Sequence, residues 1–219
     1  MLALMKRDTL VNRGAIIGVE IIMIFGVVLQ QEIILLAGVL ALSINLFYYD
    51  SKVKADRFMV SLPIERINLV RSRYLSIVSN GILLIMTQWI VTVIINRLSS
   101  EAWIYEYTGQ DVLIIFSFIL LVSACVSVYY LFRAFNVANY VLIGILFFGY
   151  LSILGAIFTR QLDENGESII YFNSETVYLP DWVEATFTFQ PYITFPFIAI
   201  CVFLLSMKLS EWSIKRKLV

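Results

Sequence analysis

Long apolar runs that are almost free of charge recur along the sequence and constrain its fold more than any other feature. An α-helix rises about 1.5 Å per residue, so crossing about 30 Å of hydrocarbon requires roughly 20 apolar residues. Five of the runs contain no charged residue, and the first contains only Glu20. The sequence therefore predicts six membrane spans: Gly14–Gln30, Ile33–Tyr49, Tyr74–Asn96, Val112–Phe132, Ala134–Thr159 and Ala185–Met207.

The composition agrees with a bilayer environment. Hydrophobic residues make up 60% of the 219 residues and charged residues 15%, which is far from the balance of an ordinary soluble domain. A soluble fold of this size would leave about a third of its unfolded-chain surface in water. We therefore expect an all-α integral membrane protein, and exclude soluble enzymes and nucleic-acid binders. The absence of histidine also excludes His-ligated metal sites and Ser-His or Cys-His catalytic pairs.

Basic residues predict the orientation of the spans. If the N-terminus is cytoplasmic, 14 of the 16 Lys and Arg residues fall on the inner side, and only Arg97 and Arg160 fall outside. Cytoplasmic loops of membrane proteins carry such an excess. We therefore expect a multi-pass protein of the plasma membrane with both termini in the cytoplasm. Residues 1–13 are expected to form an interfacial helix, followed by a single six-span domain over residues 14–219.

The loop over residues 50–73 joins the second and third spans and is the most informative segment. Four apolar residues in it are spaced as on one helical face: Ala55, Phe58, Met59 and Leu62. Pro63 ends that helix and suits the first turn of a second one, which is expected to run into the third span. One interpretation is a basic loop that touches anionic lipid headgroups. The other is a docking element with an apolar ridge and charges around it.

The loop also contains Ser61-Leu62-Pro63, then Arg66, Leu69-Val70 and Arg73-Tyr74. Together with the six spans, these residues resemble the small ABC type-2 export permeases, in which a lysine is usual at the position of Arg73. Within that family the chain looks most similar to exporters of phenol-soluble modulins and other amphipathic or antimicrobial peptides. The sequence match covers about 25 residues, whereas the topology matches over the whole chain.

The resemblance implies that Asp50–Leu62 is a coupling helix that docks on a separate ATPase subunit. The residues it assigns to coupling are Lys54, Ala55, Asp56, Arg57, Phe58, Met59, Leu62, Pro63 and Arg66. The phosphate-binding motif Gly-x4-Gly-Lys-Ser/Thr is absent from the sequence. We therefore expect that this chain is not an enzyme and has no cofactor, with ATP and Mg²⁺ bound by the partner. Two copies are expected to form a homodimer around the substrate pathway.

Three further features allow either a functional or a structural interpretation. Glu20 is a candidate for the substrate pathway, because an intramembrane carboxylate is costly, or it makes a structural hydrogen bond between helices. The outer loop, residues 160–184, is acidic and contains two β-prone stretches, Ile169–Phe172 and Thr176–Leu179. Aromatic residues near span ends are expected to form interfacial belts; they include Phe47, Tyr48, Tyr49, Tyr74, Trp103, Tyr129, Tyr130, Trp182 and Trp212.

Two other classes of function stay open on the sequence alone. One is a membrane sensor or immunity protein that does not transport. The other is a secondary transporter, which the scarcity of intramembrane charge and the absence of visible repeats disfavour.

Overall fold

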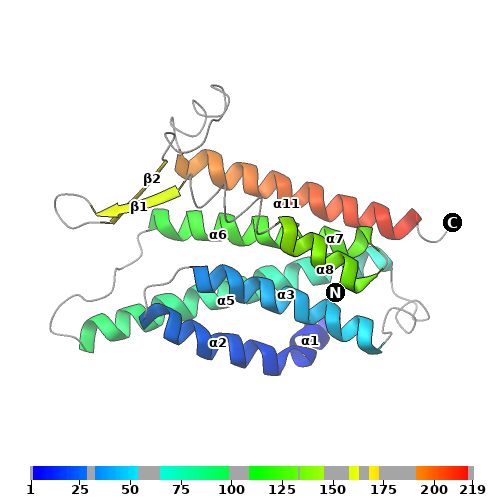
Figure 1. Cartoon of the computed structure of the whole chain (residues 1–219), viewed down its shortest axis with the longest axis horizontal. Helices are drawn as coiled ribbons and strands as arrows, with labels where there is room; N and C mark the ends of the chain where they lie inside the picture. The colour runs from blue at the N-terminus through cyan, green and yellow to red at the C-terminus, as the bar shows by residue number, and fades with distance from the viewer. Residues whose placement is uncertain are drawn as a thin grey trace.

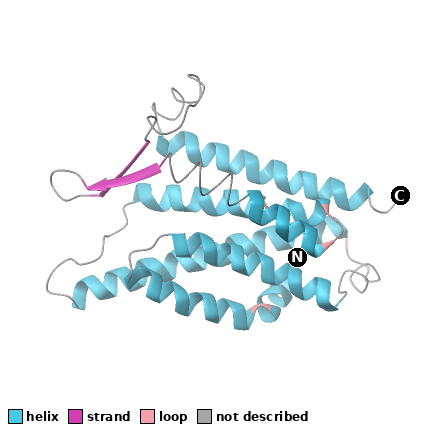
Figure 2. Cartoon of the chain, viewed as in Figure 1, coloured by secondary structure: helices cyan, strands magenta, loops and turns pink. Residues whose placement is uncertain are grey.

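The computed structural model describes residues 2–28, 33–53, 65–98, 109–132, 134–145, 158–162, 168–172 and 191–216. These residues are mainly helical, with one two-stranded sheet (Figures 1 and 2). The helices are α1 (Leu2–Val11), α2 (Arg13–Val28), α3 (Ile33–Val53), α5 (Arg66–Leu98), α6 (Gly109–Ala124), α7 (Ser127–Leu131), α8 (Phe135–Gly144) and α11 (Pro191–Arg216). The strands are β1 (Phe158–Leu162) and β2 (Ser168–Phe172).

The long helices lie lengthwise beside one another in a bundle (Figure 1). α2 packs on both α3 and α5, and α11 packs on α6, α5 and α7. The marked N- and C-termini lie toward the same end of the bundle, as do the last turn of α3 and the first turn of α5, while the β-hairpin lies at the other end (Figure 1). This arrangement agrees with the expectation that both termini lie on the same side of the membrane.

Three of the described helices are long and apolar enough to cross a bilayer: Ile67–Leu98, Val112–Leu131 and Tyr192–Arg216. A fourth span is added if the bent pair of α1 and α2 is counted as one. The chain is therefore a multi-pass helical protein, whereas the count of six spans stays a prediction. α5 has 33 residues, which corresponds to about 50 Å. It thus exceeds the hydrocarbon thickness, and its basic first turns extend beyond the apolar run.

The described residues are helical, as expected, apart from one hairpin, and this hairpin corrects the end of the fifth span. Phe158 and Thr159 were assigned to that span, but they begin β1, which pairs antiparallel with β2. Ile169–Phe172 forms a strand as predicted. Its partner is β1, not residues 176–179, which lie outside the described residues. Asn165-Gly166, between the two strands, is a strong signal in the sequence for a hairpin at this place.

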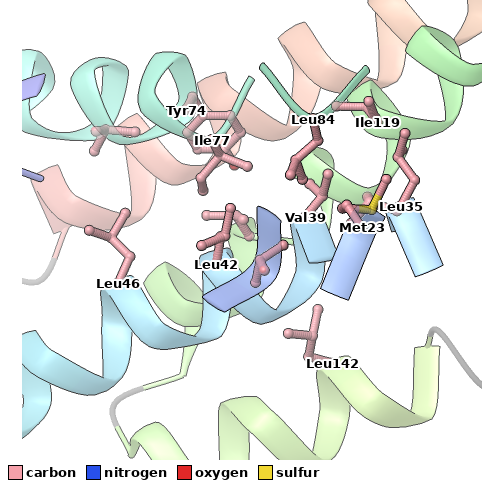
Figure 3. Packing of buried hydrophobic residues seen from close by; sticks show 14 of the residues in the cluster. Met23, Leu35, Val39, Leu42, Leu46, Tyr74, Ile77, Leu84, Ile119 and Leu142 are labelled. Carbon is pink, nitrogen blue, oxygen red and sulfur yellow. The ribbon is translucent and has the colours of Figure 1, made fainter. Parts of the chain in front are cut away.

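A cluster of buried apolar side chains joins α2, α3, α5, α6, α7 and α8 (Figure 3). Two glycines allow the helices to approach closely. A Cβ added at Gly38 of α3 would lie 2.8 Å from Val19 Cγ1, and one at Gly81 of α5 would lie 2.6 Å from Ile119 Cγ2. Small residues at such positions are typical of helix packing inside membranes, where close backbone approach supplies the attraction.

The outer faces of the same helices are apolar as well. Exposed side chains include Phe25 on α2, Trp89 on α5, and Phe197 and Leu205 on α11. A soluble protein rarely exposes continuous apolar surface of this extent. An environment of lipid around the bundle accounts for it, because lipid tails are as apolar as the side chains.

α1 meets α2 at an angle of 65°. Asn12 occupies the corner between them, where it is 2% exposed, and its Oδ1 accepts a hydrogen bond of 2.6 Å from Asn45 Nδ2 of α3. Asparagine is a weak helix former, so a bend at this position costs little. The predicted N-terminal helix therefore exists, and its corner is fixed to α3.

Candidate functional site

The structure describes the two bases of the predicted coupling loop and not its middle. α3 continues through Asp50 to Val53, so the first four residues assigned to the coupling helix belong to α3. At the other base, α5 begins at Arg66 and continues through Ile67 and Val70, as the sequence predicted. The remaining predicted coupling residues lie outside the described residues: Lys54, Ala55, Asp56, Arg57, Phe58, Met59, Leu62 and Pro63.

A buried cluster of charges joins these two bases to α1. Arg73 of α5 forms an ion pair with Asp50 of α3 through Nη2 and Oδ2, and its Nε lies 3.7 Å from Asp8 Oδ2 of α1. The side chains of Arg73, Asp8 and Asp50 are only 2%, 1% and 13% exposed. Arg7 adds a second cation, with Nη2 2.5 Å from Asp8 Oδ1 and 3.9 Å from Asp50 Oδ1. We call Arg73, Asp50 and Asp8 the base clamp.

Aromatic rings surround the base clamp. The guanidinium carbon of Arg73 lies 5.2 Å from the centre of the Phe47 ring, which stacks on Tyr129 with centroids 4.3 Å apart. Phe47 also contacts Tyr130 edge-on at 5.6 Å. Tyr130 is buried inside the bundle, so the prediction that it belongs to an interfacial belt is wrong. Phe47 and Tyr129 are half-buried, and for them the belt stays a prediction. Tyr48, Tyr49 and Trp212 are exposed, as belt residues would be.

A second polar link connects α5 to the C-terminal helix. Arg71 Nε donates to Glu211 Oε1 at 2.7 Å, and Lys208 Nζ donates to Glu211 Oε2 at 3.1 Å. The side chain of Arg71 is 41% exposed, in contrast to the buried Arg73 two residues later. Pairs with such exposure contribute little to stability, typically less than about 1 kcal/mol.

Serines of α11 bond to the break between α6 and α7. Tyr74 Oη lies 2.7 Å from Ser206 Oγ and 2.9 Å from Ser210 Oγ. Ser206 Oγ also donates to the carbonyl of Ala124, the last residue of α6, and Ser213 Oγ donates to the carbonyl of Tyr130 in α7. A broken helix inside a membrane requires such partners for its freed carbonyls. Tyr74 is fully buried, so it too is not a belt residue.

Glu20 lies in the middle of α2, and both of its carboxylate oxygens are buried without a hydrogen-bond partner among the described residues. The structural alternative, a hydrogen bond to a neighbouring helix, is thus not observed. A buried carboxylate without a partner is unfavourable, and within a membrane such residues usually serve function. Glu20 therefore stays a candidate for the substrate pathway.

Sequence reasoning missed the base clamp. Asp50 directly follows the second apolar run and Arg73 directly precedes the third. Two consecutive antiparallel spans place such flanking residues on one side of the membrane at similar depth, so their pairing could have been inferred. The contribution of Asp8 could not, because it depends on the 65° corner between α1 and α2.

Apolar outer faces, bilayer-length helices and a charged cluster at one end define a multi-pass helical membrane protein. The sequence adds the family. Residues 3–214 match the family described as ABC-2 family transporter protein, and the chain belongs to it. It is accordingly a membrane permease of an ABC transporter, and its family implies an ATPase partner subunit. No curated protein and no solved structure matches the chain.

Proposed function

We propose that the chain is the permease subunit of an ATP-driven exporter in the plasma membrane. Two copies form the substrate pathway, and each binds a cytoplasmic ATPase subunit through the segment between α3 and α5. The family match over residues 3–214 supports this proposal. It favours transport over the sensor or immunity function, and an ATP-driven carrier over a secondary transporter.

The observation that carries the coupling role is the clamping of both bases of the loop. Asp50 and Arg73 hold the end of α3 against the start of α5, and Asp8 attaches α1 to the same point. The two helices that flank the segment are thereby held to each other and to α1. Phe58, Met59 and Leu62 are proposed as the apolar ridge that enters a groove on the ATPase, with Lys54, Asp56 and Arg57 at its rim.

Chemistry on ATP is proposed to take place entirely on the partner. The sequence contains no phosphate-binding loop, so this chain supplies the pathway and the docking segment, while ATP and Mg²⁺ bind to the ATPase. Amphipathic or antimicrobial peptides are the proposed cargo, on the resemblance of the loop to the permeases that export them. Glu20 would attract the cationic side chains of such a peptide within the apolar part of the pathway.

The docking assignment is tested by comparing Phe58→Ala with Lys52→Ala. Central apolar anchors cost about 2–4 kcal/mol on truncation, whereas rim charges cost far less. Phe58→Ala should therefore weaken ATPase association by roughly 30-fold or more. Lys52, which is exposed at the end of α3, should matter less than about threefold and mainly through salt dependence. The measurement is the amount of ATPase retained by each purified variant in detergent.

A basic loop that only touches lipid gives the opposite order. Charge removal would then weaken membrane attachment, and Phe58→Ala would affect no protein partner. Equal retention of ATPase by Phe58→Ala and the wild type would remove that residue from the interface. If Met59→Ala and Leu62→Ala also bound normally, the docking proposal would be abandoned. Expression in the membrane fraction is the control that each variant is inserted.

A further inference from the structure

The base clamp joins three helices at the two bases of one loop. α3 ends at Val53, three residues after Asp50, and α5 begins at Arg66, seven residues before Arg73. The ion pair between Arg73 and Asp50 thus closes the loop at its base, and Asp8 brings in α1 from the other side. The two helices that flank the loop, α3 and α5, therefore meet α1 at Arg73.

Burial shows that stability is a weak reason for the base clamp. Arg73, Asp8 and Asp50 are all nearly removed from solvent. Desolvation of buried charges commonly cancels their attraction, and apolar replacements of similar volume are often as stable or more so. In some proteins, buried charges instead hold the neighbouring elements in one defined geometry. The pair of Arg71 and Glu211 joins the same α5 to α11 and provides a comparison with a solvated cation, because the Arg71 side chain is 41% exposed while that of Glu211 is 8% exposed.

The Phe47 ring restricts the geometry further. The guanidinium of Arg73 lies over this ring, and the ring in turn stacks on Tyr129 of α7. A guanidinium combines a planar fork of donors with a face that stacks on aromatic rings, whereas an ammonium is a point charge. The pocket therefore fits arginine, and it extends the base clamp to a fourth helix.

We propose that Arg73 is a positioning residue for energy coupling: it fixes the bases of the loop so that movement imposed by the ATPase reaches α1, α3 and α5 together. The inference rests on the proposed function, because it requires an ATPase that acts on this loop. Without the base clamp the ATPase still binds the middle of the loop. The movement that the ATPase imposes on the loop then separates α3 from α5 and does not reach the outer ends of the helices.

The test uses Leu98 as a reporter. This residue is 83% exposed and ends α5, so it lies on the same continuous helix as Arg73. A Leu98→Cys variant, with Cys125 and Cys201 replaced by alanine, is assembled with its ATPase in lipid nanodiscs. The rate of labelling by a water-soluble maleimide is then measured with and without Mg-ATP and vanadate. With the base clamp intact, trapping should change the rate by at least about fivefold, the lower range of allosteric coupling.

The decisive variant is the neutral triple Asp8→Asn, Asp50→Asn, Arg73→Met. It removes the three buried charges together. Arg7 loses its carboxylate partners Asp8 and Asp50, but its side chain is 33% exposed and can be solvated. The variant should therefore insert and retain ATPase within about twofold of wild type. Its labelling rate should nevertheless not respond to trapping. Arg73→Lys should respond partly, and the control Arg71→Gln should respond as wild type does. Arg73→Gln alone leaves two carboxylates together and serves as a check on stability.

The outcomes separate this inference from the proposed function. If the wild-type chain retains no ATPase, the proposed function fails. If it retains ATPase and the triple variant responds to trapping as wild type does, only the role of Arg73 is overturned. Loss of ATPase binding by the triple variant would also overturn it, since the base clamp would then shape the docking surface. A wild-type reporter that ignores trapping would contradict transmission along α5.

Discussion

At the scale of single residues, Glu20 is the clearest conflict between local energetics and the surrounding packing. Its two buried oxygens lack partners among the described residues, which usually costs about 1–3 kcal/mol or more for a charged group. Glu20→Leu should therefore leave the thermal unfolding temperature in detergent unchanged or higher. Export of an amphipathic cationic peptide into vesicles should fall, because the proposed pathway loses its carboxylate. The exposed Glu65→Leu is the control for stability. A marked loss of stability in Glu20→Leu would show that the carboxylate has a structural partner.

Tyr74 makes the opposite prediction. Its hydroxyl joins α5 to Ser206 and Ser210 of α11, and Ser206 in turn bonds to the end of α6. Hydrogen bonds between membrane helices contribute on average about 0.6 kcal/mol and at most about 2 kcal/mol. Tyr74→Phe should thus lower stability by about 1–2 kcal/mol, measured as denaturant midpoint in mixed micelles. Tyr48→Phe, at an exposed ring, should have no measurable effect. Equal midpoints for the two variants would contradict the network.

At the scale of elements, the helices depend on close approach at two glycines. Alanine usually stabilises a helix relative to glycine by roughly 0.5–1 kcal/mol. Gly81→Ala should do the reverse, because the new Cβ would lie 2.6 Å from Ile119 Cγ2 and must separate α5 from α6. Overpacking of this kind typically costs about 1–3 kcal/mol. Gly18→Ala is the matched control, since nothing lies within 4 Å of its added Cβ. Melting curves of the purified variants in one detergent would give the order, and a stabilised Gly81→Ala would refute the contact.

The same elements show what the sequence could predict. Absence of charge over bilayer length located α2, α3, α5, α6 and α11, because charged side chains are costly in hydrocarbon. It did not give their ends: α5 begins eight residues before the predicted span, and α11 ends nine residues after it. Hydropathy could not locate β1, since Phe158 and Thr159 extend an apolar run without interruption. It also could not separate core aromatic residues from belt residues. Phe47 and Tyr48 are adjacent in sequence, and only the neighbouring helices decide that one stacks on Tyr129 while the other is exposed.

At the scale of the whole molecule, the termini, the last turn of α3 and the first turn of α5 occupy one end of the bundle and the hairpin the other (Figure 1). The base clamp joins α3 and α5 near that end. The charges of the sequence are divided in the same way, with 14 basic residues assigned to the inner side and 2 to the outer side. Proteins obey this bias because basic segments resist translocation. In the proposed orientation, the base clamp faces the compartment in which an ATPase finds ATP. Exposed residues at opposite ends of the described helices make this orientation testable.

Ser51 and Leu98 give the sharpest test of orientation. Both are exposed, Ser51 in the last turn of α3 and Leu98 as the last residue of α5, so both accept a cysteine without disturbing the core. In a background with Cys125 and Cys201 replaced by alanine, an impermeant maleimide should label Leu98→Cys in intact cells and leave Ser51→Cys unmodified. Permeabilised cells should show equal labelling, which controls for reactivity. Labelling of Ser51→Cys before permeabilisation would place the loop outside the cell. Such a loop could not reach a cytoplasmic ATPase, so coupling through Arg73 would be ruled out together with the proposed topology.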